Sequence, residues 1–213
     1  MYALRRLPLL ITSALLSLAS VAPLASSSAL ERAGPAVGKP APDFTGTDSN
    51  GRTVRLADLH GKTVVLEWSN HDCPFVRKHY GSGNMQALQK EATAQGVVWL
   101  TVLSSAPGTQ GNVTPAEANE LTTRRGAAPS AVILDPSTTI AHAYAARTTP
   151  HMFVIDRDGI LRYMGGIDDK PTTDVADVKT AKNYVRLALT ALNSGAAVTE
   201  AVTRPYGCSV KYD

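Results

Sequence analysis

Several side chains able to do chemistry lie in one short stretch, EWSNHDCPFVRKHY, which spans residues 67–80. Cys73, one of only two cysteines in the 213 residues, is followed directly by Pro74 and has His71 and Arg77 nearby. A cysteine in such surroundings can be an ionised nucleophile, a metal ligand or one half of a structural disulfide. Which of these uses applies depends on the strand and the helix that position Cys73.

The residues that flank Cys73 indicate that it opens a helix. Residues 63–68 (TVVLEW) are β-branched and apolar and predict a buried strand that ends just before it. Pro74 suits the first position of a helix, so the sulfur is expected at a helix N-terminus, where free amides and the helix dipole stabilise a thiolate. Arg77 and Lys78 would add to this effect. The alternative is a buried, unreactive cysteine that packs as a small apolar side chain.

The second cysteine, Cys208, follows Gly207 in the C-terminal sequence YGCSVKYD. It is the only partner within the chain that could resolve an oxidised Cys73. A permanent structural disulfide between the two is the other interpretation. Closing a loop of roughly 100 residues or more contributes about 4–5 kcal/mol in the chain-entropy model. The sequence leaves both interpretations open.

A metal-binding interpretation combines the Cys73 thiolate with the imidazole groups of nearby histidines. Thiolate and imidazole together suit Cu(I) or Zn(II), and the candidate ligands are Cys73, His71, His79 and His151. Only one cysteine lies in this loop, however, so we interpret the histidines as a solvated polar rim and predict no metal site. A copper- or zinc-binding chaperone remains the alternative. No organic cofactor is expected, because no glycine-rich nucleotide loop is present.

Strand and helix patterns alternate along the chain, which predicts an α/β fold with a mixed central β-sheet flanked by helices. Strands are expected at 44–47, 53–56, 63–68, 97–103, 131–134, 152–156 and 160–163. Helices are expected from 74 with a break at 81–83, then at 84–94, 114–125, 138–144 and 183–192. Asn50-Gly51 predicts a hairpin turn, and Asn84 and Thr114 are expected to cap helices. Residues 166–180 form a charged insertion.

The N-terminus resembles a secretory signal peptide, which we assign to residues 1–29. Arg5 and Arg6 precede an apolar run over 7–18, and small residues follow it. The run is too short to span a bilayer, which needs about 20 residues. The mature protein is therefore expected to be periplasmic or secreted, without stable membrane contact, and its cysteines can stay oxidised there. A short anchor that is never cleaved is the alternative.

The mature chain divides into a flexible lead-in at 30–36, a folded domain at 37–194 and a C-terminal tail at 195–213 that carries Cys208. Removing the signal peptide takes away two arginines and no acidic residue, which leaves 19 basic against 18 acidic side chains. This near-neutral chain has few aromatic residues and no basic patch, so a nucleic-acid partner is excluded.

Four motifs resemble the thioredoxin-like redoxins, and more narrowly the alkyl hydroperoxide reductase/thiol-specific antioxidant (AhpC/TSA) group and its exported bacterial relatives. They are APDF, GRTVRLADLHGKTVVLEW, a cysteine that opens a helix, and TTPHMFVIDRDGILRYMGGID. The resemblance covers roughly residues 37–193 and implies a thioredoxin fold with thiol chemistry. The implied function is a thiol–disulfide oxidoreductase or a peroxiredoxin-like antioxidant.

The active-site motif departs from both of the family's usual patterns. Thioredoxins carry two cysteines separated by two residues, but Val76 and Asn70 occupy the positions three residues after and before Cys73. Typical peroxiredoxins place a threonine at the position of Asn70 and an arginine near the position of Pro150, and Arg147 is not clearly equivalent. Neither standard site is complete, so we expect weaker peroxide reduction than in a complete peroxiredoxin.

The resemblance also implies roles for residues around Cys73. Thr149-Pro150 matches the cis-proline turn that faces the active cysteine and exposes backbone to a substrate, although an ordinary trans proline is the alternative. Pro74 is expected beside the same substrate. Glu67 stands where thioredoxins keep a buried acid, unless it points outward, and it or His71 would assist proton movement.

The expected partners follow from this chemistry. They are a protein or small-molecule disulfide, or a peroxide, together with an external reductant. A non-catalytic domain with a structural Cys73–Cys208 disulfide remains a further alternative.

Overall fold

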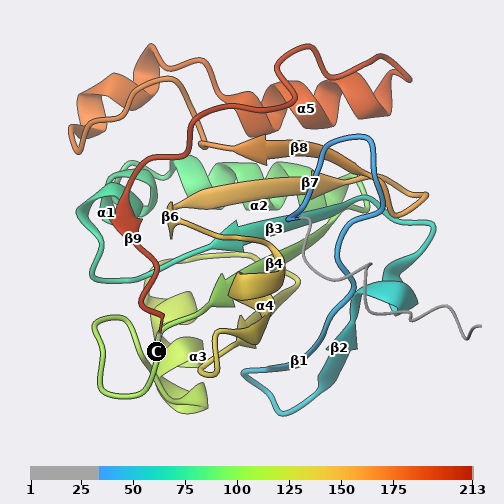
Figure 1. The fold of residues 1–213 in the computed structure, drawn as a ribbon. Helices are drawn as coiled ribbons and strands as arrows, with labels where there is room; N and C mark the ends of the chain where they lie inside the picture. The colour runs from blue at the N-terminus through green and yellow to red at the C-terminus, as the bar shows by residue number, and fades with distance from the viewer. Residues whose placement is uncertain (1–33, 213) are drawn as a thin grey trace, which may run out of the picture. The chain divides into compact units, whose positions relative to one another are not determined.

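A computed structural model of the protein describes residues 34–212 (Figure 1). The predicted signal peptide at 1–29 and the first part of the lead-in lie outside the described residues. Among residues 34–212, no helix combines the length and apolar character needed to cross a membrane.

A seven-stranded mixed sheet forms the centre of the domain (Figure 1). Its strands, in the order β2-β1-β5-β4-β3-β7-β8, are Thr53–Arg55, Thr45–Asp48, Ala131–Leu134, Val98–Leu103, Val64–Trp68, His151–Ile155 and Leu161–Gly165. The three central strands β5, β4 and β3 are parallel, and the other pairings are antiparallel. The predicted α/β fold with a mixed central sheet is therefore confirmed.

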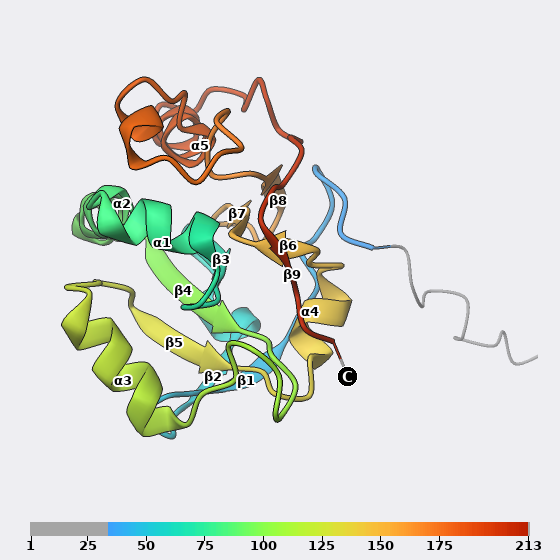
Figure 2. The same ribbon diagram turned by 90° about the vertical axis from the view of Figure 1, so that its left-hand side faces the viewer.

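Helices cover both faces of this sheet. Their bounds are Pro74–Gly81 (α1), Asn84–Ala94 (α2), Pro115–Arg124 (α3), Thr139–Ala143 (α4) and Tyr184–Asn193 (α5), with 3-10 turns η2 at Leu56–Leu59 and η3 at Val175–Lys179. Figure 2 shows α1, α2 and α3 on one face and α4 on the other. α5 packs against β7 and β8.

The central strand β3 is buried along its whole length, because both of its faces are covered. Trp68 packs against Phe153 and Tyr144 on the α4 face, with ring centroids 5.2 and 5.3 Å apart. Such aromatic pairs contribute about 0.5–1.5 kcal/mol beyond the area they bury. Val65 faces the opposite cluster beneath α1 and α2. This packing holds the end of β3 rigidly, and the loop that carries Cys73 begins there.

Most predicted turns and caps are present. Gly51 adopts the positive φ of 78° expected at the hairpin turn, and Thr114 forms the predicted capping box. The cap assigned to Asn84 is wrong: Gly83, with φ 75°, is the N-cap of α2, and Asn84 is the first residue of that helix. Its side chain instead contacts His79, with Nδ2 2.9 Å from Nδ1.

The C-terminal tail returns to the active-site edge of the domain, which the sequence patterns did not predict. It forms a bridge between Val202 and Met164 beside β8. The tail then contributes β9 (Cys208–Ser209), which pairs with β6 (Thr148–Thr149) in a small antiparallel sheet. Figures 1 and 2 both show β9 running beside β6 near the start of α1.

Candidate active site

Cys73 lies at the start of α1 as predicted. It is the N-cap residue, and Pro74 is the first residue of the helix. The Cys73 N–H donates to the Asn70 carbonyl at 3.1 Å, and the Cys73 carbonyl accepts from the Arg77 N–H at 2.9 Å. This turn holds the sulfur beside the first free amides of the helix, and the side chain is fully buried.

Two backbone groups contact the sulfur, one from each strand of the small β6–β9 sheet. The Cys73 thiol donates to the Thr149 carbonyl at 2.9 Å, and the Cys208 N–H donates to the sulfur at 3.4 Å. The Thr149–Pro150 bond is cis, as the motif predicted. Thr149 and Pro150 are both buried, whereas Pro74 is exposed at the surface. The structure thus brings the two cysteines and the proline turn together.

The tail approaches this turn as an extended strand. Thr149 pairs with Cys208 and Thr148 with Ser209. Gly207 has a φ of 141°, and a Cβ added there would lie 2.0 Å from the Thr149 carbonyl oxygen. Only glycine therefore permits so close an approach. Beyond Cys208, the Val210 N–H donates to the Arg147 carbonyl at 3.0 Å. The tail therefore contacts the segment before Pro150 both before the cysteine, at Gly207, and after it, at Val210.

Electrostatics distinguish the two thiols. Burial alone would raise the pKa of Cys73, but hydrogen bonds with Cys208, with Thr149 and with the Val76 backbone outweigh it and lower the pKa of this thiol. For Cys208, burial and then the neighbouring Cys73 sulfur raise the pKa to about 11. Of the two thiols, Cys73 therefore loses its proton more readily, and Cys208 keeps its proton to higher pH.

Glu67 is buried rather than outward-facing, which settles the orientation that the sequence left open. Its carboxylate accepts four hydrogen bonds, and the donors are Tyr80, Gln89, Trp99 and Thr101 at 2.9–3.2 Å. Burial raises the pKa of Glu67 despite these donors. None of the four donors is Cys73, so a role for Glu67 in proton movement stays a prediction.

The loop before Cys73 is fixed by its own polar side chains. Asn70 accepts from the Asp72 N–H at 2.9 Å and donates to the Gln110 carbonyl at 3.2 Å. Its amide is thus used to build the loop and makes no hydrogen bond to the sulfur. The His71 Nε2 lies 3.4 Å from the Asp72 carboxylate and does not contact Cys73. Burial lowers the pKa of His71, although Asp72 opposes this. A catalytic role for His71 stays a prediction.

The interpretation of the histidines as a solvated rim is wrong for two of them. His79 and His151 are buried, and burial lowers the pKa of each to about 3. The His151 Nδ1 accepts from the Arg147 N–H at 3.2 Å, and its ring packs at a tilt against Phe153 with centroids 4.4 Å apart. Within the part of the chain that the structure describes, no three His, Cys, Asp or Glu side chains are grouped to hold a metal ion.

A polar cluster that the sequence did not predict lies beneath the tail. We call Lys78, His79 and Asp168 the tyrosine seat, because the Tyr206 hydroxyl contacts His79 and Asp168 and its ring faces the Lys78 Nζ at 5.7 Å. All three seat side chains are buried. The only signal in the sequence was Tyr206 itself, two residues before Cys208, because polar residues in a helix give no indication that they are buried.

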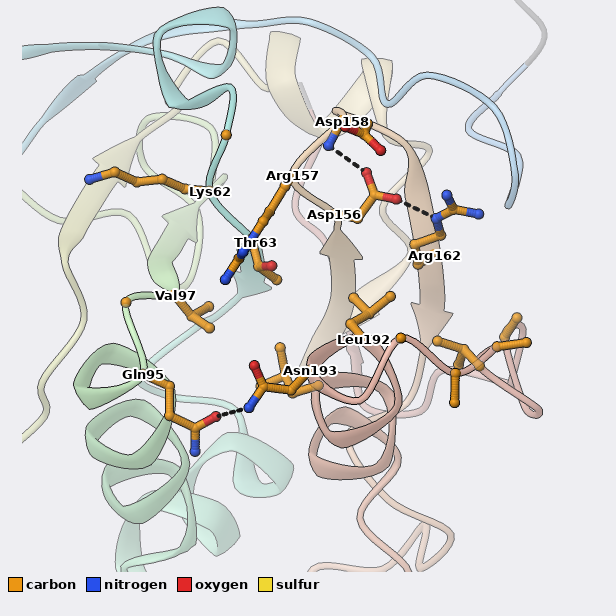
Figure 3. Close-up of a pocket in the computed structure, with 18 of the residues that line it drawn as sticks. Lys62, Thr63, Gln95, Val97, Asp156, Arg157, Asp158, Arg162, Leu192 and Asn193 are labelled. Carbon is orange, nitrogen blue, oxygen red and sulfur yellow. Dashed lines mark hydrogen bonds and ion pairs between the residues drawn. The ribbon is translucent and has the colours of Figure 1, made fainter.

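A cavity of about 690 Å³ lies away from these residues (Figure 3). Lys62 and Val97 line it, together with the turn at 156–158. Lys62 and Val97 precede β3 and β4, whereas Cys73 follows the end of β3. The cavity is therefore at the opposite end of the sheet. Figure 3 shows Arg162 pointing to Asp156 and Gln95 to Asn193, so several of its polar groups are already paired.

The fold and the cysteine site together define a class of protein. A mixed sheet, a cysteine at the N-terminus of the helix after a central strand, and a cis-proline turn facing it are the features of a thioredoxin-like redoxin. Residues 37–164 match the model of the AhpC/TSA family, and the chain belongs to that family.

Solved structures support the fold. An uncharacterized conserved protein from Geobacillus kaustophilus is 27% identical, with a TM-score of 0.71 over 84% of this chain and 93% of that one. A hypothetical protein from Sinorhizobium meliloti 1021 is 23% identical, with a TM-score of 0.70 over 84% and 95%. A putative thiol:disulfide interchange protein DsbE from Chlorobium tepidum is 24% identical, with a TM-score of 0.51 over 62% and 85%. Comparison with curated proteins gives no match.

Proposed function

We propose that the protein is an exported thiol–disulfide oxidoreductase in which Cys73 and Cys208 alternate between dithiol and disulfide. One observation carries this proposal: the tail places the Cys208 N–H 3.4 Å from the Cys73 sulfur, although 135 positions separate the two residues in the chain. The sulfur also lies at a helix N-terminus, which favours the reactive thiolate.

The reaction with a disulfide proceeds by two exchanges. The Cys73 thiolate attacks one sulfur of the substrate, which forms a mixed disulfide and releases one substrate thiolate. Cys208 then loses its proton and attacks the Cys73 sulfur, which releases the second thiolate and leaves the Cys73–Cys208 disulfide. The substrate gains two electrons, and an external dithiol must supply two electrons to restore the protein.

The pKa shifts support this order of attack. While Cys73 is a thiolate, its hydrogen bond and charge contribute to the raised pKa of Cys208. Once Cys73 is in a mixed disulfide its charge is gone, so these two contributions vanish and the pKa of Cys208 falls. Cys208 therefore becomes a better nucleophile after the first exchange, although burial, the largest cause of its raised pKa, remains.

Peroxide is the second candidate substrate. Here Cys73 would take one oxygen, becoming a sulfenic acid and releasing an alcohol or water, and Cys208 would then displace water to form the same disulfide. The Asn70 side chain is held by hydrogen bonds within the loop and stands where a typical peroxiredoxin has a threonine hydroxyl. We therefore propose that disulfides react comparably to or faster than peroxides.

Intact-mass measurement tests the proposal. Reduced protein is treated with glutathione disulfide or with hydrogen peroxide. Wild type should lose two hydrogens, while Cys208→Ser should keep a glutathione adduct or one added oxygen on Cys73. Cys73→Ser is the matched control and should remain unmodified. If Cys208→Ser turns over at the wild-type rate with a protein reductant, resolution comes from outside the chain and the proposed role of Cys208 is wrong.

A further inference from the structure

The tyrosine seat takes no part in the exchange steps, yet it contacts the tail two residues before Cys208. We propose that the seat is a positioning device: by holding Tyr206, it keeps Cys208 on the Cys73 sulfur, where it both shields the nucleophile and is placed to resolve it. This inference rests on the proposed function, because it assigns a role in the second exchange.

The hydrogen bonds of Tyr206 have a defined direction. Asn84 Nδ2 donates to His79 Nδ1 at 2.9 Å, so the neutral ring carries its proton on Nε2. That nitrogen donates to the Tyr206 hydroxyl oxygen at 3.2 Å. The hydroxyl in turn donates to the Asp168 carboxylate. Tyr206 thus acts as donor and acceptor at once, and hydrogen bonds to a charged acceptor are about twice as strong as neutral ones.

The seat is built from two separate parts of the chain. Lys78 and His79 belong to α1, the helix that Cys73 opens. Asp168 comes from the charged insertion at 166–180, whose purpose the sequence left unexplained. Lys78 Nζ donates to the Lys170 carbonyl at 2.7 Å and lies 4.0 Å from Asp168 Oδ2. One rigid helix therefore carries both the nucleophile and two members of the anchor for its partner.

The seat also carries a cost in stability. Lys78 and Asp168 are almost completely buried, and Asp168 Oδ2 has no hydrogen-bond partner among the described residues. Buried charges at this separation do not regain all the free energy lost on leaving water. Such costs are tolerated where the groups serve a function. Holding the tail in place is the function that these contacts support.

The link from the seat to the sulfur is short. Only Gly207 separates Tyr206 from Cys208, and neighbouring Cα atoms are about 3.8 Å apart. The Tyr206 ring also packs edge-on against Phe75, with centroids 5.8 Å apart. Movement of Tyr206 would therefore move Cys208 as well. Releasing it should have opposite effects on the two exchanges, because Cys73 becomes easier to reach while Cys208 is placed less well.

A chromogenic aromatic disulfide, dithiobis-nitrobenzoate, separates the two exchanges. Attack by Cys73 releases a first coloured thiolate, and attack by Cys208 on the mixed disulfide releases a second. Stopped-flow absorbance on the full chain therefore gives two rates. Tyr206→Phe removes only the hydroxyl. Tyr184→Phe is the matched control, because Tyr184 and Tyr206 both line a cavity of about 550 Å³, whereas the Tyr184 hydroxyl makes no hydrogen bond among the described residues.

Tyr206→Phe should release the first thiolate faster than wild type and the second about tenfold more slowly, given what hydrogen bonds to charged groups contribute. Tyr184→Phe should match wild type in both phases. The inference is overturned if the two tyrosine variants behave alike, or if Tyr206→Phe changes both phases in the same direction together with a lower melting temperature. Absence of a second release from wild type would instead refute the proposed function, and this inference with it.

Discussion

Replacing Gly207 by alanine tests whether the tail controls access to Cys73. The added Cβ would lie 2.0 Å from the Thr149 carbonyl oxygen and 3.2 Å from the Pro150 nitrogen, and the φ of 141° is strained for any residue with a Cβ. Backbone strain of this kind costs about 1–3 kcal/mol, and the overlap adds to it. We take roughly 2 kcal/mol as the minimum total cost of docking the tail in the Gly207→Ala protein. A cost of that size raises the population of the undocked tail about thirtyfold.

The assay is the alkylation rate of Cys73 by iodoacetamide in a Cys208→Ser background, where a single thiol reacts. Gly207→Ala should increase this rate roughly thirtyfold if undocking limits access. Gly81→Ala is the matched control, because a Cβ there meets no atom within 4 Å and the backbone is helical. Equal rates in the Gly207→Ala and Gly81→Ala proteins would show that the tail does not shield the sulfur.

Three further outcomes are expected. The alkylation rate of Cys73 should rise with pH at a midpoint below the usual thiol value of about 8.5, and a midpoint at or above it would refute the activated thiol. Hydrogen peroxide turnover with excess reductant should be slow, since losing one preorganised donor at Asn70 costs about 10²–10³ in rate; fast consumption would reverse the substrate ranking. Burial raises the pKa of Glu67 above its ordinary 4.5, so wild type should lose stability as pH rises above that value. In urea titrations at several pH values, Glu67→Gln should lack this pH-dependent loss. Its stability should be lower than that of wild type by about 1–3 kcal/mol, because some donors to the Glu67 carboxylate are left unsatisfied. Parallel pH profiles for wild type and Glu67→Gln would contradict the raised pKa.

The sequence predicted those features whose cause is local. A continuous β-branched, apolar run and Pro74 were enough to place β3 and the start of α1, and the capping box at Thr114 was read from four residues. The cap at Asn84 was misassigned because Gly83 can adopt a positive φ and is preferred at that turn. Local propensity cannot choose between neighbouring residues when both suit a helix start.

Features that depend on distant contacts could not be predicted. Whether Glu67 faced inward depended on Trp99 and Gln89, which come from other elements. The buried state of His79 depended on the tail and on the insertion that carries Asp168. The tail itself has no strand pattern of its own, and β9 exists only because β6 offers it backbone partners.

The reduction potential of the Cys73–Cys208 pair tests the central claim most directly. It is measured by equilibrating the full chain with thiol–disulfide buffers of known potential. Intact mass then gives the fractions of the dithiol and disulfide forms. A redox-cycling pair should give a value between about −120 mV, typical of an oxidant, and about −270 mV, typical of a reductant. A value below about −300 mV, or failure of the two cysteines to form a disulfide, would contradict the proposed catalytic cycle.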